Sequence, residues 1–597
     1  MTGVETMIMQ RWTRWLVCAV VCVGTEALLV RSATAQVSGT MKDALAVIPD
    51  NAMGFVCVPN VKAFDSKLEQ TLKHLGLDGA VPPPMNSLAG ILGVQMGMTE
   101  GLDSDGAVIV VMMPAAHVME LQMKTALIVA TKDAEVLLGA MGGEAGEGGT
   151  WTVTMGAMPI SAVVRGEHVV LAMTPDLAKN IATSPPIAKK LKPAELKTLE
   201  GLDLAVWVDG DRMLGMVKPQ VSGFLDMAMM VQGGAASGWQ AKQMEASKKQ
   251  IDMFFDGTAS MTLGLSLGQP GVGLRFGMTT KAGSALAKQI KLRPTTASLL
   301  TGVPSEKYMF AFGETVDPAA IKGGMEYLDM YLAVPDDAKE IDQDQLTRLK
   351  GVIEEWLVMI TALRGSVVSL VPGPGGIFGL GVLIDTTDSA QWLELAGDVI
   401  DAGKKLATDA DMKEKLEAIV YRTEAETISG VPIQHLKLDV DKIEAVDEDD
   451  MEEVLKIVGR DGMLLRMGAV DAKTVAVAFG GGAAHMGRLI ETARKKDAPL
   501  DRDAGIKKVA AHMPGRRASV GYAAVDQILE TVRTGVKLID EDEEFPVRMP
   551  VINAPLAMTS SGGDGWGQFD LFVPRELLVA GAQAVRMMMG GSSQPEY

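Results

Sequence analysis

The sequence predicts an α+β protein built from tandem duplicated domains, each a mostly antiparallel sheet with helices packed on one face. Two modules recur along the 597 residues. One is a strand that runs into an amphipathic helix (β-α), and the other is a hairpin followed by a helix (β-β-α). The modules follow one another in the same order in both halves of the chain. Such an arrangement is typical of split βαβ sandwiches.

The β-α module consists of a short apolar run, a polar turn and then an apolar period of 3.6 residues. Its four copies begin at Gly54, Leu204, Met309 and Ala518. In the third copy, Asp317 and Pro318 are typical of a helix start, with Asp as the N-cap and Pro at the first helical position. The module therefore predicts four strands that lead directly into helices.

The β-β-α module has Gly- and Pro-rich turns between its strands. Its copies begin at Thr258, Gly365 and Leu556, and a fourth with a longer connection includes the segment from Lys124. Turn residues stand where the strands reverse, for example Pro374, Gly375 and Gly376. In the middle of each half, the segment from Ile160 also parallels the segment from Met463.

These repeats predict the domain organisation. Extra helices around 237–255 and 342–363 are expected to interrupt both halves at similar places. The predicted parts are a signal peptide (1–35), a first α+β repeat domain (36–292), a linker (293–306), a second α+β repeat domain (307–590) and a C-terminal tail (591–597).

The first residues have the pattern of a secretory signal peptide. Arg11 and Arg14 form a basic region, and residues 15–23 form a short apolar run. Small residues at Ala33 and Ala35 then predict cleavage before Gln36. We therefore expect an exported protein.

A retained membrane anchor is the alternative reading of this segment. A spanning helix needs about 20 consecutive apolar residues. Glu26 interrupts the apolar run and Arg31 ends it, which favours cleavage and a protein without a stable membrane span. The expected location is the periplasm or the cell envelope, in soluble form. Whether the signal is cleaved or retained stays open at this point.

Composition narrows the class of partner. The chain has a net charge of -19 and a pI near 4.9. Binding to nucleic acid requires clustered Lys and Arg, and anionic lipid surfaces also attract basic segments. The charge therefore argues against nucleic acid and against anionic lipid surfaces as partners.

The cysteines predict no disulfide. Cys18 and Cys22 lie in the predicted signal peptide, so only Cys57 remains in the mature chain. Its apolar neighbours place it in a strand, where a buried thiol is the expected role.

The polar residues contain no recognisable catalytic or metal-binding motif. No two histidines have the spacing of a helical zinc motif, and the acidic clusters at 447–450 and 540–544 are interpreted as solvated loops. Methionines such as those at 227, 229–230 and 587–589 are interpreted as core residues. The histidines are His74, His117, His168, His435, His485 and His512.

One glycine-rich segment has the outline of a phosphate-binding loop. It runs from Gly482 to Leu489 between an expected strand and an expected helix. However, Arg488 and Leu489 replace the Lys and the Ser or Thr that bind phosphate and magnesium, so we interpret it as a turn. We assign no catalytic, cofactor-binding or metal-binding residue.

The opening of the mature chain resembles a known family. The stretch I-P-D-N-A-x-x-F-V-x-V-P-N, here Ile48 to Asn60, follows the signal segment. This combination is similar to a family of uncharacterised exported bacterial proteins, known only as a domain of unknown function. The resemblance implies a large α+β protein on the envelope side, and it carries over no catalytic residue.

These observations predict a non-catalytic exported protein that binds or scaffolds an unknown envelope protein or ligand. Repeated modules provide extended surfaces for such a role. Two alternatives stay open: an exported hydrolase with a site formed between the two halves, and a protein that captures a metal or another small ligand.

Overall fold

A computed structural model provides the structure of the chain. It describes residues 39–588, except for 78–83, 85, 156–157, 233–237, 332–341, 407–412, 414–415, 440–447, 460–462 and 541–549. The predicted cleavage site at Ala33, Ala35 and Gln36 lies outside the described residues. The described chain forms two compact units: an N-terminal unit (39–228, 248–287 and 565–588) and a C-terminal unit (229–247 and 288–564).

Antiparallel pairing joins neighbouring strands throughout the sheet of the N-terminal unit. From one edge to the other, the strand order is β4 (Glu144–Ala145), β5 (Thr150–Met155), β6 (Met158–Arg165), β7 (His168–Ala172), β3 (Thr125–Ala130), β2 (Val108–Met112), β1 (Gly54–Val58), β8 (Leu204–Asp209), β9 (Thr258–Gly268), β10 (Gly271–Thr280) and β20 (Trp566–Pro574).

The sheet of the C-terminal unit is also antiparallel between neighbours. Its order is β14 (Ile419–Ile428), β15 (Val431–Leu438), β16 (Leu464–Ala469), β17 (Thr474–Gly480), β13 (Phe378–Thr386), β12 (Ile360–Ser369), β11 (Tyr308–Thr315), β18 (Ser519–Ala523) and β19 (Leu556–Gly563).

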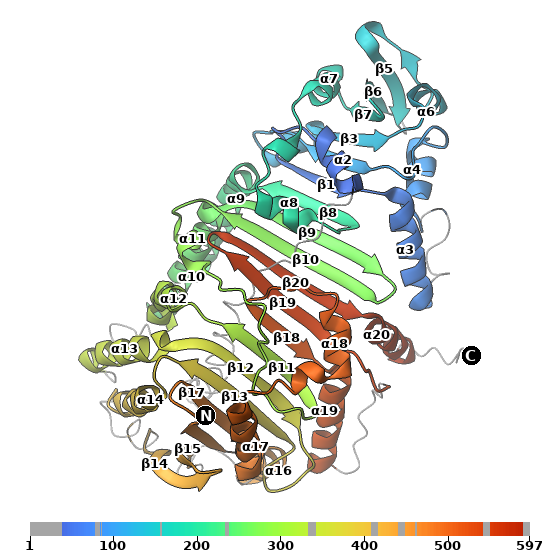
Figure 1. Cartoon of the computed structure of the whole chain (residues 1–597). Coiled ribbons are helices and arrows are strands. Elements are labelled where there is room, and N and C mark those ends of the chain that lie inside the picture. The colour runs from blue at the N-terminus through green and yellow to red at the C-terminus, as the bar shows by residue number, and fades with distance from the viewer. Residues whose placement is uncertain are drawn as a thin grey trace. The chain divides into compact units, whose positions relative to one another are not determined.

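The two strand orders are the same when each strand from β1 to β9 is matched with the strand ten labels later (Figure 1). Along the N-terminal order from β4 to β9, every pairing of neighbouring strands has its counterpart along the C-terminal order from β14 to β19. A shared order with such a non-sequential path, in which the third strand inserts beside the seventh, indicates a duplicated domain. The predicted fold class, duplicated α+β domains with antiparallel sheets, is confirmed.

Helices follow the strands as the modules predict. In chain order they are α2 (Gly39–Val47), α3 (Val61–His74), α4 (Leu88–Met96), α5 (Val118–Met123), α6 (Ala134–Ala140), α7 (Pro175–Thr183), α8 (Pro193–Leu199), α9 (Gly210–Gln232), α10 (Gly238–Gly257), α11 (Ala285–Gln289), α12 (Pro318–Tyr331), α13 (Gln343–Val358), α14 (Ser389–Lys404), α16 (Glu448–Val458), α17 (Gly482–Lys495), α18 (Ala504–Ala510), α19 (Val525–Ile539) and α20 (Arg575–Met588).

Equivalent helices of the two halves start in the same way. After β3, Thr131 is followed two residues later by Asp133, whose carboxylate caps α6. Thr386, the last residue of the matching strand β13, is likewise followed two residues later by Asp388, which caps α14. Asp is a favoured N-cap because its side chain accepts hydrogen bonds from free N–H groups of the first turn. The duplication thus extends to local sequence.

The two extra helices do not occupy similar places, and that prediction was wrong. α10 comes after β8 and α9, whereas α13 comes after β11 and α12. The strand that matches β11 is β1, not β8. Helical periodicity marks that a helix is present, but the place of that helix relative to a sheet depends on strand pairing that is remote in sequence.

Side chains of the N-terminal sheet alternate between two cores. Phe55, Ile109 and Ile128 pack on one face, against helices that include α2 and α7. Val108 and Val129 point to the other face and pack against α4 and α6. Side chains alternate along a strand, so both faces of this sheet have an apolar part. Helices cover parts of both faces, whereas the sequence predicts helices on one face only.

Candidate functional site

A row of apolar side chains crosses the N-terminal sheet in register. Phe569 of β20 faces Phe276 of β10, which also faces Leu263 of β9. Leu263 faces Val206 of β8, and Val206 faces Val56 of β1. Directly paired residues of antiparallel strands point to the same side. The row therefore lies on one face of the sheet.

A second row lies beside the first. Leu571, Leu274, Leu265 and Leu204 pair in the same way across β20, β10, β9 and β8. Each stands two residues from a member of the first row, so the two rows share a face. We call the two rows together the apolar strand face: Phe569, Phe276, Leu263, Val206, Val56, Leu571, Leu274, Leu265 and Leu204.

The apolar strand face is incompletely covered. Leu263 and Leu274 keep 52% and 41% of their surface exposed, and the other members are half-buried. None of the members carries a charge or a hydrogen-bonding side chain. Single exposed apolar residues are normal on protein surfaces, but contiguous apolar patches mark interaction sites or ligand-binding surfaces.

The opposite face of the same strands is polar and buried. It carries Ser260 and Thr262 of β9, Thr279 of β10, and Gln568 and Asp570 of β20. A half-buried strand normally places apolar residues inside and polar residues outside. In β9, β10 and β20 this pattern is inverted.

A glutamate of α8 accepts hydrogen bonds from the first part of the buried polar face. Glu195 accepts hydrogen bonds from Trp207 Nε1 (3.3 Å), from the Ser260 hydroxyl and from the Lys192 N–H (2.7 Å). The Ser260 and Thr279 hydroxyls are 2.6 Å apart. Buried polar groups are stable only with partners, and α8 supplies them here.

An arginine engages the second part of the buried polar face, in which Gln568 Oε1 has no hydrogen-bond partner among the described residues. Arg275 Nε donates to Asp570 Oδ1 at 2.7 Å, and Nη1 donates to the carbonyl oxygens of Thr198 (3.2 Å) and Glu200 (2.9 Å) at the end of α8. Gln568 Nε2 donates to the second Asp570 oxygen at 2.6 Å. The polar side chains of β10 and β20 therefore lock the sheet to α8, and the apolar side chains of these strands are left for the other face.

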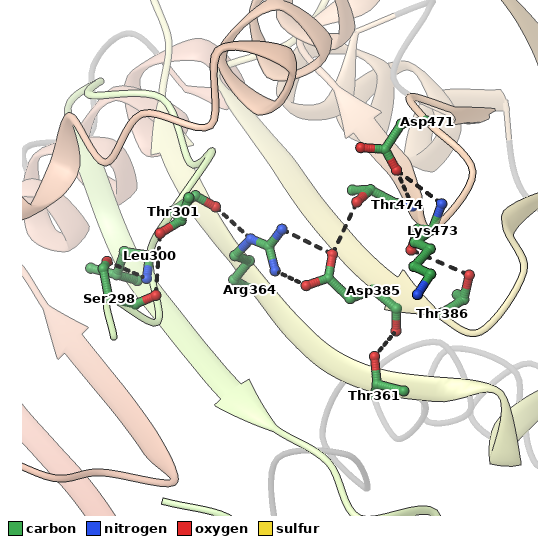
Figure 2. A network of polar contacts seen from close by, with 10 residues as sticks. All are labelled: Ser298, Leu300, Thr301, Thr361, Arg364, Asp385, Thr386, Asp471, Lys473 and Thr474. Carbon is green, nitrogen blue, oxygen red and sulfur yellow. Dashed lines mark hydrogen bonds and ion pairs between the residues drawn. The ribbon is translucent and has the colours of Figure 1, made fainter. Parts of the chain in front are cut away.

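The C-terminal unit contains a polar network that links remote segments (Figure 2). Arg364 of β12 forms a two-pronged ion pair with Asp385 of β13, and Arg364 Nε donates to the Thr301 carbonyl. Thr474 Oγ1 donates to Asp385 at 3.1 Å. The network holds a segment before β11 against β12, β13 and β17, which is a structural role.

Each of the six histidines lies on a different element or connection. His74 ends α3, His168 begins β7, His435 lies in β15 and His485 in α17, while His117 precedes α5 and His512 follows α18. Among the described residues, no group of three or more His, Cys, Asp or Glu side chains is arranged to hold a metal ion. His435 instead lies 2.7 Å from Glu426, which also accepts from Arg466.

The glycine-rich segment at the start of α17 is closely packed. Gly480, Gly481 and Gly482 all adopt positive φ angles, and the Gly481 N–H donates to the Gly375 carbonyl at 2.8 Å. A Cβ at Gly480 would approach the Phe378 carbonyl oxygen to 2.5 Å. These glycines are therefore required by the strand–helix turn itself.

Arg488 and His485, from the same segment, contact a glutamate. Arg488 forms an ion pair with Glu306, and the buried His485 Nδ1 lies 3.3 Å from Glu306 Oε2. Burial alone would raise the pKa of Glu306, but the contacts with His485 and Arg488 outweigh it and hold this pKa below its ordinary value.

Glu306 is expected to make the C-terminal unit sensitive to acid. A carboxylate with a lower pKa in the folded state stabilises the fold above its unfolded pKa, about 4.3, and this contribution is lost as the pH falls through the folded pKa. We expect Glu306→Gln to lower the urea midpoint at pH 7 and to reduce its further decline below about pH 4.3. Parallel midpoint curves for both proteins between pH 7 and pH 3 would contradict this account.

Cys57 is expected to be unreactive in the folded protein. Its side chain is fully buried, and burial raises the pKa of its thiol to about 12. Because the thiolate is the reactive form, a chain that starts at Gln36 should release no colour from a disulfide reagent at pH 8. It should react with one equivalent after unfolding in guanidinium. Rapid reaction without denaturant would show that Cys57 is accessible.

The remaining predicted features lie partly outside the described residues. Met227 is exposed on α9, so its interpretation as a core residue was wrong. The structure leaves the side chains at 229–230 and 587–589 undescribed, and residues 447 and 541–544 of the acidic clusters are also outside it. Within the described part of the chain, no helix has the length and apolar character needed to cross a bilayer.

Sequence reasoning missed the apolar strand face. The alternation in β9, where Met261, Leu263 and Leu265 alternate with Ser260 and Thr262, indicates a two-sided strand. It does not show which side is buried, because that depends on α8. The pairing of the rows across β8, β9, β10 and β20 depends on segments up to some 370 residues apart, since β8 begins at Leu204 and β20 ends at Pro574.

Comparison with known proteins gives no functional assignment. No protein-family model and no curated protein matches the chain. It is similar to three crystal structures of TP0453. Form III has 7% identity and a TM-score of 0.21 and covers 49% of this chain and 100% of that chain. Form IV has 8% identity and a TM-score of 0.20 and covers 50% of this chain and 98% of that chain. Form I has 9% identity and a TM-score of 0.20 and covers 48% of this chain and 97% of that chain. Likeness at this level carries no functional argument.

Proposed function

We propose that the protein is an exported, non-catalytic binding or scaffold protein of the periplasm or cell envelope, and that it holds its partner on the apolar strand face. The observation that carries the proposal is the inverted polarity of β9, β10 and β20. Their polar side chains are buried against α8, while Leu263 and Leu274 remain exposed.

The inversion has a physical cost that binding can offset. Burying a large apolar side chain completely contributes about 1.5–3 kcal/mol relative to leaving it exposed. A strand with its apolar side outward forgoes this contribution during folding. The contribution becomes available when a partner covers the face.

The described ionisable clusters support a non-catalytic role. Glu195, Asp385 and Glu306 are each engaged by donors or cations that hold elements of the fold together. These contacts give each carboxylate a structural function.

The binding proposal predicts that one charge on the apolar strand face abolishes capture of the partner. A bait that starts at Gln36 should recover a component of envelope extract from the native host, identified by mass spectrometry of proteins and of lipids. Leu263→Glu should lose this component, because a carboxylate would have to be desolvated at the contact.

The matched control is Val94→Glu on α4 of the same unit, where the side chain is 68% exposed and lies outside the face. This variant should retain the component. The proposal would be contradicted if the unmodified bait, Leu263→Glu and Val94→Glu recovered the component equally, or if the unmodified bait recovered none.

Export has its own test. Arg11 and Arg14, the following apolar run and the small residues before Gln36 support it. N-terminal sequencing of the protein purified from the host envelope should begin at Gln36. Recovery from the cytosol with residues 1–35 still attached would refute export.

A further inference from the structure

We propose that the apolar strand face binds the hydrocarbon chain of a long-chain fatty acid, whose carboxylate lies beside Arg575 and His74. The inference rests on the proposed binding function and names the class of ligand. Three observations carry it: the apolar row of β10 that ends at a hollow, the two basic residues that line this hollow and the uncharged surface beside it.

The apolar strand face continues along β10 to a hollow. Val272 pairs with Val573 of β20 and stands two residues from Leu274, so it shares their face. It also lines a hollow of about 10 Å³ between α3 and α20, together with the side chains of Leu75, Leu578 and Val579. The apolar row of β10 thus ends at the hollow.

The hollow is mostly apolar, but its two ionisable lining residues, His74 and Arg575, are basic in an otherwise acidic protein. Its polar lining consists of Thr71, His74 and Arg575, together with backbone of the β9–β10 turn, and no carboxylate lines it. Arginine binds carboxylates through two parallel N–H donors, and histidine can add a third donor. A single anionic head at the end of an uncharged surface matches this distribution of charge.

The uncharged surface beside the hollow favours a small head group. A volume of about 10 Å³ holds about one water molecule, so the head group would lie at the rim beside Arg575. A fatty acid has no further polar group, whereas the glycerol and ester groups of a phospholipid would lie against side chains that offer no hydrogen bonds. We therefore commit to a fatty acid as the ligand.

The apolar side chains of β10 fit part of a hydrocarbon chain. From Val272 through Leu274 to Phe276, β10 presents apolar side chains on this face over about 14 Å, at about 3.4 Å per residue, and Met278 beyond them is buried. These side chains offer no hydrogen bonds. They therefore suit a ligand part that needs none.

The test uses cis-parinaric acid, a fluorescent fatty acid, and the whole chain from Gln36. We expect saturable binding at one site and its loss in Leu274→Glu. Leu274→Gln serves as a second variant if the charged one does not fold, and it should weaken binding at least tenfold. Val94→Glu is the control and should bind like the unmodified protein.

A second variant tests the head-group site. Arg575→Gln should weaken binding of parinaric acid about tenfold, the equivalent of about 1.4 kcal/mol, and should leave binding of the corresponding uncharged alcohol unchanged. Equal weakening for acid and alcohol would overturn the role of Arg575 as the carboxylate partner.

Other outcomes would overturn the ligand class. These are the absence of saturable binding, binding that survives both Leu274 substitutions, retention on phosphatidylglycerol vesicles that free oleate does not compete away, or a dimer in solution that Leu274→Glu dissociates. If Leu263→Glu still abolishes capture of an envelope protein while parinaric acid does not bind, the binding function stands and the fatty acid inference fails.

Discussion

Glu195→Ala is expected to lower the free energy of unfolding of the N-terminal unit by about 3 kcal/mol. The substitution removes the acceptor for three donors: Trp207 Nε1, the Ser260 hydroxyl and the Lys192 N–H. Leaving a buried donor unsatisfied costs about 1–3 kcal/mol, and Trp207 and Ser260 are both buried. Hydrogen exchange of peptides from β8 and β9 in urea would measure the change in this unit alone.

Glu195→Gln is the matched control for this prediction. It keeps one carbonyl oxygen as acceptor and the shape of the side chain, so we expect a loss of about half that size, in line with the weaker bonds of a neutral acceptor. A change below about 1 kcal/mol for Glu195→Ala would show that the buried polar face does not depend on α8.

Arg364→Met is expected to lower the free energy of unfolding of the C-terminal unit by about 2–3 kcal/mol. It removes the two-pronged pair with Asp385 and the bond to the Thr301 carbonyl, while Asp385 keeps its charge in a half-buried place (Figure 2). A hydrogen bond to a charged group contributes about 1.5–3 kcal/mol. Urea denaturation with hydrogen exchange of β12 and β13 would measure the loss.

Two further variants isolate the pair. Arg364→Lys keeps the charge but loses the planar fork of the guanidinium group. Its free energy of unfolding should therefore lie between those of the unmodified protein and of Arg364→Met. Asp385→Asn combined with Arg364→Met should cost less than the sum of the single changes, since the two residues interact directly. Additive losses would contradict a specific pair.

The sequence was sufficient to predict the repeats. Each strand–helix opening, such as those at Gly54 and Met309, has a switch in apolar period that depends only on near neighbours. The N-caps Asp133 and Asp388 reflect the same local logic. The duplicated antiparallel fold was therefore predictable, whereas the place of α10 and α13 was not, because it depends on pairing between remote strands.

The candidate site was not predictable. Ser260 and Leu263 belong to one alternating strand, and the sequence does not show which of the two sides faces the core. The structure shows that Glu195 and Arg275 engage the polar side. The choice depends on a helix some sixty residues before the strand, since α8 begins at Pro193 and β9 at Thr258.

Site-specific crosslinking tests most directly whether the apolar strand face holds a partner. A photoreactive amino acid is placed at position 263 and, as the control, at position 94, and both proteins are illuminated in envelope extract from the native host. We expect a defined adduct, protein or lipid, from position 263 and none from position 94. No adduct at 263, or the same adducts from both positions, would contradict the claim that this face holds a partner.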